Sequence, residues 1–165
     1  MPAPAVGYWG GDITSADLSG TAPSRIDRGD INFWVAGPTT PMADLNLLAS
    51  QGAVGNYAGH LICSVFNNGV QYVAAGGLKA SYNFGTQMGS FSVINYDRHI
   101  NFTATGTPVT SGATYKFGIN DVPGLAGSIN GSFYGPLAAE TGGNFNFHTT
   151  AGPTYLTSGI FAAKR

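Results

Sequence analysis

The clearest structural pattern in the chain is Gly131-Ser-Phe-Tyr-Gly-Pro-Leu-Ala-Ala-Glu-Thr-Gly-Gly-Asn-Phe-Asn-Phe147, which precedes the closing segment Leu156-Thr-Ser-Gly-Ile-Phe-Ala-Ala-Lys-Arg165. Aromatic residues alternate with small or polar ones, the period of two that is typical of strands with one buried face. The Gly-Pro pair at 135–136 predicts a turn, and the residues up to Glu140 are too few for a real helix. The segments therefore predict a hairpin with a small detour in its connection and a closing strand after it.

Working outward from this hairpin, strand-like segments separated by turn residues follow one another from residue 54 onward. Their connections are short, so neighbours in sequence are expected to pair antiparallel as an up-and-down meander. Because closure removes the two exposed edges, the sequence predicts an all-β fold, a single eight-stranded antiparallel up-and-down barrel. The eight expected strands are residues 55–66, 72–84, 88–96, 99–106, 113–120, 125–134, 143–149 and 155–163.

The alternation sorts the side chains of these strands into an inward and an outward set. So many inward aromatic residues predict an interior that is filled by side chains. The outward set is polar, which excludes a barrel with a lipid-facing exterior. The inward set is Tyr82, Phe84, Phe91, Val93, Ile100, Phe102, Tyr115, Phe117, Ile119, Ile129, Phe133, Phe145, Phe147 and Ile160. The outward set is Lys79, Ser81, Asn83, Asn101, Thr103, Lys116, Asn120, Ser128, Asn130, Asn144 and Asn146.

The chain is expected to divide into an N-terminal extension, residues 1–53, and a barrel, residues 54–165. The extension is Gly-rich and irregular at its start, and residues 31–36 have the composition of a strand. It also contains one short helix at about 41–50, which we expect to pack on the barrel.

The helix has recognisable ends: Thr40 is the expected N-cap, Pro41 the first helical residue, and Gly52 lies just past its end. Leu45 and Leu48 form a narrow apolar stripe. Such a stripe is enough for a helix to lie on a sheet or to cover one end of a barrel.

Composition excludes several classes of function. Charged residues make up 9% of the chain, the net charge is -1, and Lys and Arg form no run, which argues against a nucleic-acid partner. The single cysteine, Cys63, excludes an internal disulfide, and its apolar surroundings predict a buried, unreactive thiol.

No apolar run approaches the roughly 18 residues of a membrane-spanning helix. Met1-Pro-Ala-Pro does not resemble a signal peptide, so we expect either a cytosolic protein or a domain of a longer exported chain.

At its last third the chain resembles the C-terminal barrel of the transferrin-binding-protein-B-like family of bacterial surface proteins, which includes factor-H-binding protein and the hemophilins. The family pattern is a glycine-aromatic strand ending in G-x-F-[FY]-G-P, a small acidic segment, G-G-x-F, and a closing G-x-F-x-A-K-[RQ] strand. The matching residues are Gly131-Ser-Phe-Tyr-Gly-Pro136, Glu140, Gly142-Gly-Asn-Phe145 and Gly159-Ile-Phe-Ala-Ala-Lys-Arg165, within a resemblance over 54–165.

The resemblance implies a barrel exposed on the bacterial outer membrane or secreted, used for binding rather than chemistry and monomeric as an isolated domain. It does not supply the ligand, because members of the family bind different things. The chain lacks the lipobox cysteine of the lipoprotein members.

Metal and haem sites have little support. His60, His99 and His148 show no ligand-like spacing, so no metal site is predicted. Tyr57 with His60, or Tyr96 with His99, are conceivable iron-ligating pairs. The alternative is that these tyrosines pack at strand ends.

Catalysis has less support still. The acidic residues of the barrel segment are Asp97, Asp121 and Glu140, all near expected turns, and nothing brings them together. No nucleophile elbow, phosphate-binding glycine loop or cysteine-histidine pair is present. We therefore expect no enzyme, no catalytic residues and no cofactor.

Three aromatic residues outside the barrel repeat, Trp9, Phe33 and Trp34, are the candidate ligand-binding residues, because Trp and Tyr are favoured at interface hot spots. The alternative is that Trp34 packs with the helix on the end of the barrel. The sequence thus predicts a non-catalytic module that binds a host or environmental protein, glycan, or iron or haem carrier. The alternative is a structural or secretion-guiding end domain of a longer exported protein.

Overall fold

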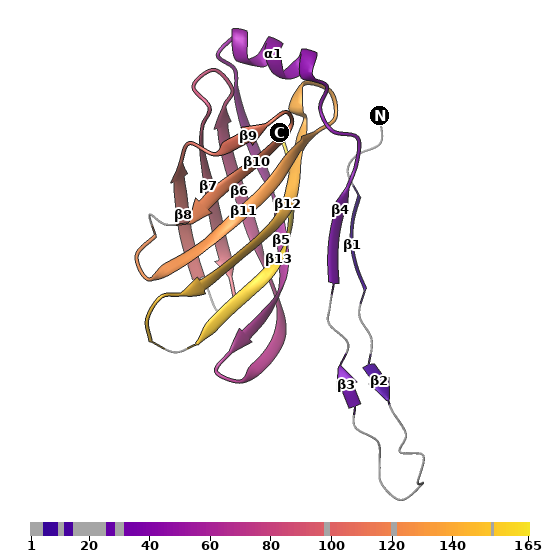
Figure 1. The fold of residues 1–165 in the computed structure, drawn as a ribbon, viewed down its shortest axis with the longest axis vertical. Helices are drawn as coiled ribbons and strands as arrows, with labels where there is room; N and C mark the ends of the chain where they lie inside the picture. Colours follow the sequence, from indigo (N-terminus) through magenta and orange to yellow (C-terminus); the bar gives the residue numbers. More distant parts are fainter. Residues whose placement is uncertain are drawn as a thin grey trace, which may run out of the picture.

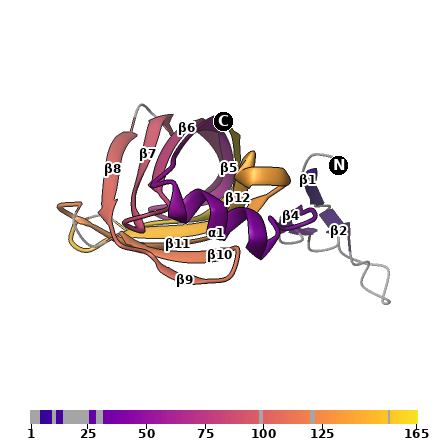
Figure 2. The ribbon, with the colours of Figure 1, turned by 90° about the horizontal axis from the view of Figure 1, so that it is seen from above.

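The computed structural model describes residues 5–9, 12–14, 26–28, 32–97, 100–119, 122–152 and 154–165. One antiparallel sheet curls into a half-barrel, and a short helix, α1 (Met42–Ser50), lies across one end (Figure 1, Figure 2). The strand order is β8-β7-β6-β5-β13-β12-β11-β10-β9. The strands are β5 (Val54–Asn67), β6 (Val70–Asn83), β7 (Met88–Tyr96), β8 (Ile100–Gly106), β9 (Val109–Ser111), β10 (Thr114–Ile119), β11 (Leu125–Tyr134), β12 (Glu140–Thr149) and β13 (Tyr155–Lys164).

The prediction of an all-β chain with one short helix is confirmed, whereas the predicted closed eight-stranded barrel is replaced by a nine-stranded curled sheet. The additional strand, β9, forms in the connection that was expected to be a loop. It pairs with the first residues of β10, on the edge that a closing strand would need. Within the described ranges, β8 pairs with β7 alone. The sheet therefore keeps two edge strands, β8 and β9.

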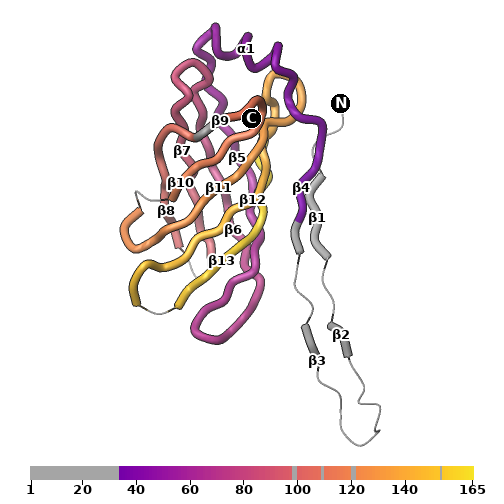
Figure 3. Tube along the Cα trace, viewed as in Figure 1, coloured from indigo at the N-terminus to yellow at the C-terminus, as the bar shows by residue number. Residues whose placement is uncertain are grey.

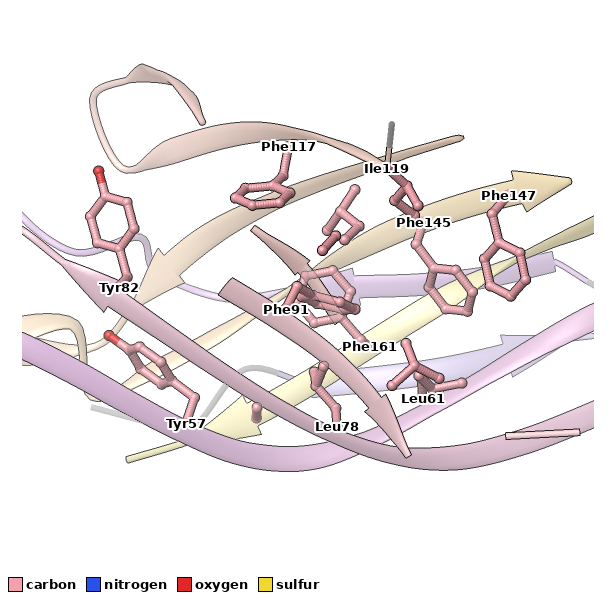
Figure 4. Close-up of a cluster of buried hydrophobic side chains, with 14 of the residues drawn as sticks. Tyr57, Leu61, Leu78, Tyr82, Phe91, Phe117, Ile119, Phe145, Phe147 and Phe161 are labelled. Carbon is pink, nitrogen blue, oxygen red and sulfur yellow. The ribbon is translucent and has the colours of Figure 1, made fainter. Parts of the chain in front are cut away.

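The interior is filled by the inward side chains, as predicted (Figure 4). Phe133 is 4% exposed and is the centre of an aromatic cluster below α1. The cavity beside these rings has a volume of about 30 Å³, room for only one or two water molecules. Four rings pack on Phe133: Tyr57, Tyr82, Phe84 and Tyr115.

One inward assignment is wrong. In β13 the side chain of Ile160 points outward, because its neighbours Gly159 and Phe161 occupy inward positions. Gly159 pairs with the interior residues Cys63 and Phe145, which fixes the parity of the strand. The glycine hid the alternation, since it has no side chain to mark the inner face. The other inward residues are buried, except that Ile100 and Tyr115 are partly buried against the core.

The helix α1 lies where the sequence predicted it and buries the predicted stripe. Leu45 and Leu48 are 8% and 4% exposed and belong to the core. The helix is followed by Gly52 with φ +59°, the left-handed conformation that favours glycine after a helix. Figure 3 shows how the chain runs from β4 (Asn32–Ala36) through α1 into β5. The strand expected at 31–36 is thus present.

The predicted N-cap is wrong: Pro41 is the N-cap, and Thr40 has another role. The Thr40 hydroxyl donates a hydrogen bond to the carbonyl of Gly135 at 2.9 Å, and its amide donates to the carbonyl of Phe133. The preceding residue, Thr39, forms a β-bridge with Tyr134. Thr40 therefore ties the entry of α1 to the turn after β11 instead of capping the helix.

That turn contains the short 3₁₀ helix η1 (Pro136–Ala138), in the detour that the Gly-Pro pair predicted. Upstream, β1 (Ala5–Trp9) pairs with β4, and β2 (Asp12–Thr14) pairs with β3 (Ile26–Arg28). None of the helices in the described part of the chain is long and apolar enough to cross a bilayer.

Candidate functional site

A groove runs along the outer face of β5, β6 and β13. It consists of two adjoining hollows of about 530 and 600 Å³, which share His60 and Ala162. We call it the outer groove. Its lining residues are Ala58, Gly59, His60, Leu61, Ile62, Ala75, Gly76, Gly77, Leu78, Lys79, Ile94, Glu140, Ile160, Phe161, Ala162, Ala163 and Lys164.

The register of the three strands explains the shape of the outer groove. Outward residues on β6, β5 and β13 lie side by side in rows, and the row through His60 has Gly77 on one side and Ala162 on the other. The next row places Ala75 and Ile160 on either side of Ile62. The small residues Gly77, Ala162 and Ala75 leave hollows beside the larger side chains in the middle of the rows.

The outer groove is apolar along most of its length, unlike the polar outward residues that the sequence analysis identified on the other strands. Beyond Ile62, the next row has Ser64 and Ser158 beside Val73, and the row after it contains Phe66 and Leu156. Phe66, Val73 and Leu156 are 40%, 46% and 47% exposed. Phe66 and Leu156 are directly opposite each other in the register of β5 and β13. Exposed apolar surface of this kind marks interaction sites.

The end of the outer groove nearer α1 is charged. Lys79 and Lys164 are both exposed and lie on either side of Ala58 in one row. Glu140 of β12 is opposite Lys164, and His60 is exposed in the next row. The two lysines outnumber the one glutamate, which gives this end a net positive charge.

Beside the outer groove, an extended segment of the chain already covers the same face. β4 lies against β12 and β13. The Cγ2 atom of Val35 is 3.1 Å from the position that a Cβ atom on Gly142 would occupy. Ile160 points outward and is nevertheless only 5% exposed, although it lies outside the interior core. This face therefore accepts a strand whose apolar side chain lies over a glycine.

Of the predicted binding residues, only Trp34 can be placed with its side chain. It is 46% exposed, and it alternates along β4 with Val35, which faces the sheet. The indole of Trp34 is therefore not part of the core, and its role in binding stays a prediction. Trp9 and Phe33 belong to the paired strands β1 and β4, but their side chains lie outside the described residues, so their roles stay predictions.

Of the conceivable iron-ligating pairs, only Tyr57 and His60 are both described, and their side chains do not point toward each other. Tyr57 points inward, is 3% exposed and donates a hydrogen bond to the Ala138 carbonyl, whereas His60 points outward. Burial raises the pKa of Tyr57 well above its usual range, which keeps the phenol protonated. Tyr96 is also buried, and its conceivable partner His99 lies outside the described residues. No cluster of three or more metal-binding side chains occurs in the described ranges.

The acidic residues named from the sequence are not brought together either. Glu140 lies at the outer groove, and Asp121 is outside the described residues. Asp97 lies at the end of the sheet away from α1, where one of its carboxylate oxygens accepts hydrogen bonds from Tyr72 at 2.7 Å and Tyr155 at 2.8 Å. These bonds bring together three residues that are distant in sequence.

A second polar group lies inside the same end of the sheet. The Tyr96 hydroxyl is 2.7 Å from the Thr157 hydroxyl and 3.0 Å from the Cys63 sulfur. Cys63 is fully buried, as predicted, and burial raises the pKa of its thiol. Among the side chains that the structure describes, no buried nitrogen or oxygen lacks a hydrogen-bond partner. These buried groups therefore satisfy one another and serve the packing of the interior.

The outer groove was not predicted from the sequence, although a signal was present. Two segments lack the polar alternation of the other strands: Leu61-Ile-Cys-Ser-Val65 is apolar except for Ser64, and Gly159-Ile-Phe-Ala-Ala163 has no polar residue. A strand that is apolar on both faces is typical of one that is covered on both faces. The pattern could have indicated that the outer face of β5 and β13 has a partner.

No protein-family model and no curated protein matches the chain significantly. Among solved structures, transferrin binding protein B from serogroup B Neisseria meningitidis is similar, with a TM-score of 0.61 and 21% identity over 83% of this chain and 30% of that one. A mutant transferrin binding protein B from Haemophilus parasuis Hp5 has a TM-score of 0.59 and 19% identity over 95% of this chain and 32% of that one.

A surface lipoprotein has a TM-score of 0.53 and 13% identity, over 95% of this chain and 75% of that protein. The chain thus spans about a third of the length of the two transferrin-binding proteins. The chain has a transferrin-binding-protein-B-like β-barrel fold.

Proposed function

We propose that this chain is a non-catalytic, surface-exposed or secreted bacterial barrel domain that binds a host or environmental ligand at its outer groove. The observation that carries the proposal is the exposed apolar surface of that groove beside a filled interior. An interior cavity of about 30 Å³ has no room for a ligand, so binding belongs on the outside. The names of the similar structures, transferrin binding protein B and surface lipoprotein, support a binding role at a surface.

Among a protein, a glycan and an iron or haem carrier, a protein ligand fits the outer groove best. Its lining is mostly apolar and includes Ile62, Ile94 and Ile160, which suits the apolar core of a protein interface. Trp34, with Trp9 and Phe33, is proposed as a second contact region on the N-terminal hairpin. The exposed indole of Trp34 is the described part of this region.

The test is a pull-down with the purified chain as bait in host fluids and extracts, followed by mass spectrometry of the bound proteins. We expect a partner that survives moderate salt and is lost with Ile94→Asp, which places a charge in the outer groove. Thr103→Asp is the matched control, because Thr103 is an exposed outward residue of β8 that does not line the outer groove. Trp34→Ala tests the hairpin separately.

A chain shown to be folded that captures nothing contradicts the proposal. That result favours the alternative, a structural or secretion-guiding end domain without a specific ligand. A partner that binds Ile94→Asp as well as the unchanged chain contradicts the location of the site.

A further inference from the structure

The kind of ligand can be specified in more detail, in an inference that rests on the proposed function. We propose that the outer groove binds an extended segment of a partner protein, with apolar side chains at alternate positions and an acidic group at the end near α1. Three observations lead to this ligand: the neighbouring β4, the spacing of the rows, and the charge of one end.

The first observation is that β4 lies on the adjoining part of the same face. Val35 lies over Gly142 there, and the buried Ile160 forms the border between the part covered by β4 and the outer groove. Across that border the pattern of small and apolar residues continues with Ala162, Gly77 and Ile62. An extended segment in the outer groove would thus extend an intramolecular interface that already exists.

The second observation is the spacing of the rows. Successive outward residues of β5, from Ala58 through His60, Ile62 and Ser64 to Phe66, are two positions apart, which is about 6.7 Å in a strand. The side chains on one face of an extended segment repeat at the same distance. Alternate apolar side chains of such a segment can therefore meet successive rows.

The third observation is the charge near α1. Lys79 and Lys164 are separated by one strand, which corresponds to about 10 Å between their backbones. A carboxylate placed over Ala58 lies within reach of both ammonium groups, and Glu140 balances only one of them. The charge therefore sets the direction of the bound segment, with its acidic end toward α1.

The probe is a fluorescein-labelled peptide, Asp-Val-Thr-Val-Thr-Val-Thr-Val-Thr, whose affinity is measured by fluorescence anisotropy. One control peptide has the same composition with its valines in one block, and another begins with Lys instead of Asp. We expect the alternating acidic peptide to bind at least tenfold more tightly than either control.

Gly77→Val tests the location of the bound peptide. A Cβ atom on Gly77 would be 3.6 Å from the nearest atom, of Ile94, so the sheet accommodates a side chain that fills the groove. We expect at least tenfold weaker peptide binding. Thr103→Val, on the outer face of β8, is the matched control and leaves the affinity unchanged.

Lys79→Glu tests the charge. We expect it to weaken binding of the acidic peptide three- to tenfold at low salt and to favour the Lys-containing peptide. Lys116→Glu, an exposed outward residue of β10, makes the same change in net charge and has no effect. Melting temperatures of all variants show that each is folded.

Several results would overturn the inference. The first is that Gly77→Val and the unchanged chain bind the peptide with equal affinity, and the second is that the blocked and alternating peptides bind with equal affinity. The third is that laurate, a fatty acid, displaces the labelled peptide at a lower concentration than unlabelled peptide does. The fourth is that the chain forms a dimer through the groove, which Gly77→Val dissociates. A captured partner that is lost with Ile94→Asp, together with no peptide binding, overturns the inference and leaves the proposed function in place. A folded chain without any partner contradicts the proposed function itself.

Discussion

Phe133 is the residue on which the packing below α1 depends most. It is 4% exposed and packs against four rings, so truncation to alanine leaves a large cavity. We predict that Phe133→Ala lowers the free energy of unfolding by about 3–5 kcal/mol, measured by urea denaturation. Asn144→Ala, at an exposed outward position, is the control and should change little. Equal effects of the two substitutions would contradict the assignment of faces.

Cys63 gives the stability a pH dependence with a defined sign. Burial raises the pKa of its thiol above the ordinary value of 9.0, so the unfolded chain loses this proton at lower pH than the folded one. The contribution of the protonated thiol to the free energy of unfolding is fully present below about pH 9. It is lost as the pH rises toward the folded pKa, with a slope of up to about 1.4 kcal/mol per pH unit.

We predict that urea unfolding between pH 8 and 10 shows a shallower decline in stability for Cys63→Ala than for the unchanged chain. The buried tyrosines add their own decline above pH 10 in both proteins, because burial also raises their pKa. If the free energy of unfolding falls equally with pH in the two proteins, the prediction is wrong, because folding then does not raise the pKa of the thiol.

The inward or outward direction of a residue could be predicted from the sequence where side chains mark the two faces of the strand. Phe145 and Phe147 alternate with asparagines and were assigned correctly to the interior. Ile160 was not, because the inward neighbour Gly159 carries no side chain. The hydrogen bonds of Asp97 could not be predicted, because Tyr72 and Tyr155 come from strands that only the folded sheet brings together.

Among the elements, the contact of β4 with the outer face can be tested by a single substitution at Gly142. A Cβ atom on Gly142 would be 3.0 Å from the Phe161 carbonyl and 3.1 Å from Val35. We predict that Gly142→Val displaces β4 and speeds amide hydrogen exchange at 34–36, while the core strands keep their protection. Asn146→Val, at an exposed outward position of the same strand, serves as the control. Unchanged exchange in Gly142→Val would contradict the docking of β4.

The elements themselves were largely predictable, since eight expected strands and the helix correspond to observed ones. β9 was not predicted, because three residues between two turns are too few to show the alternation of a strand. Thr40 was misread for a related reason. A threonine before Pro41 has the sequence of an N-cap, but its hydroxyl has a competing acceptor, the carbonyl of Gly135, 95 residues away.

For the molecule as a whole, the sheet, the helix and β4 leave the outer groove uncovered among the described residues. The inner face is filled, α1 covers one end, and β4 covers part of β12 and β13. The outer groove lies on β5, β6 and β13 beside them. The fold class could be read from alternation, but the groove depends on the register of three strands, which no local pattern specifies.

The most direct measurement uses the isoleucines, which the fold divides between the two faces. Ile62, Ile94 and Ile160 line the outer groove, whereas Ile119 and Ile129 are fully buried in the interior. We would label the isoleucine δ1 methyl groups and record their NMR shifts during titration with the alternating acidic peptide. The account predicts saturable shifts of the three outer methyl signals with the two inner ones unchanged. Shifts confined to Ile119 and Ile129 would place the ligand inside the sheet and contradict the account.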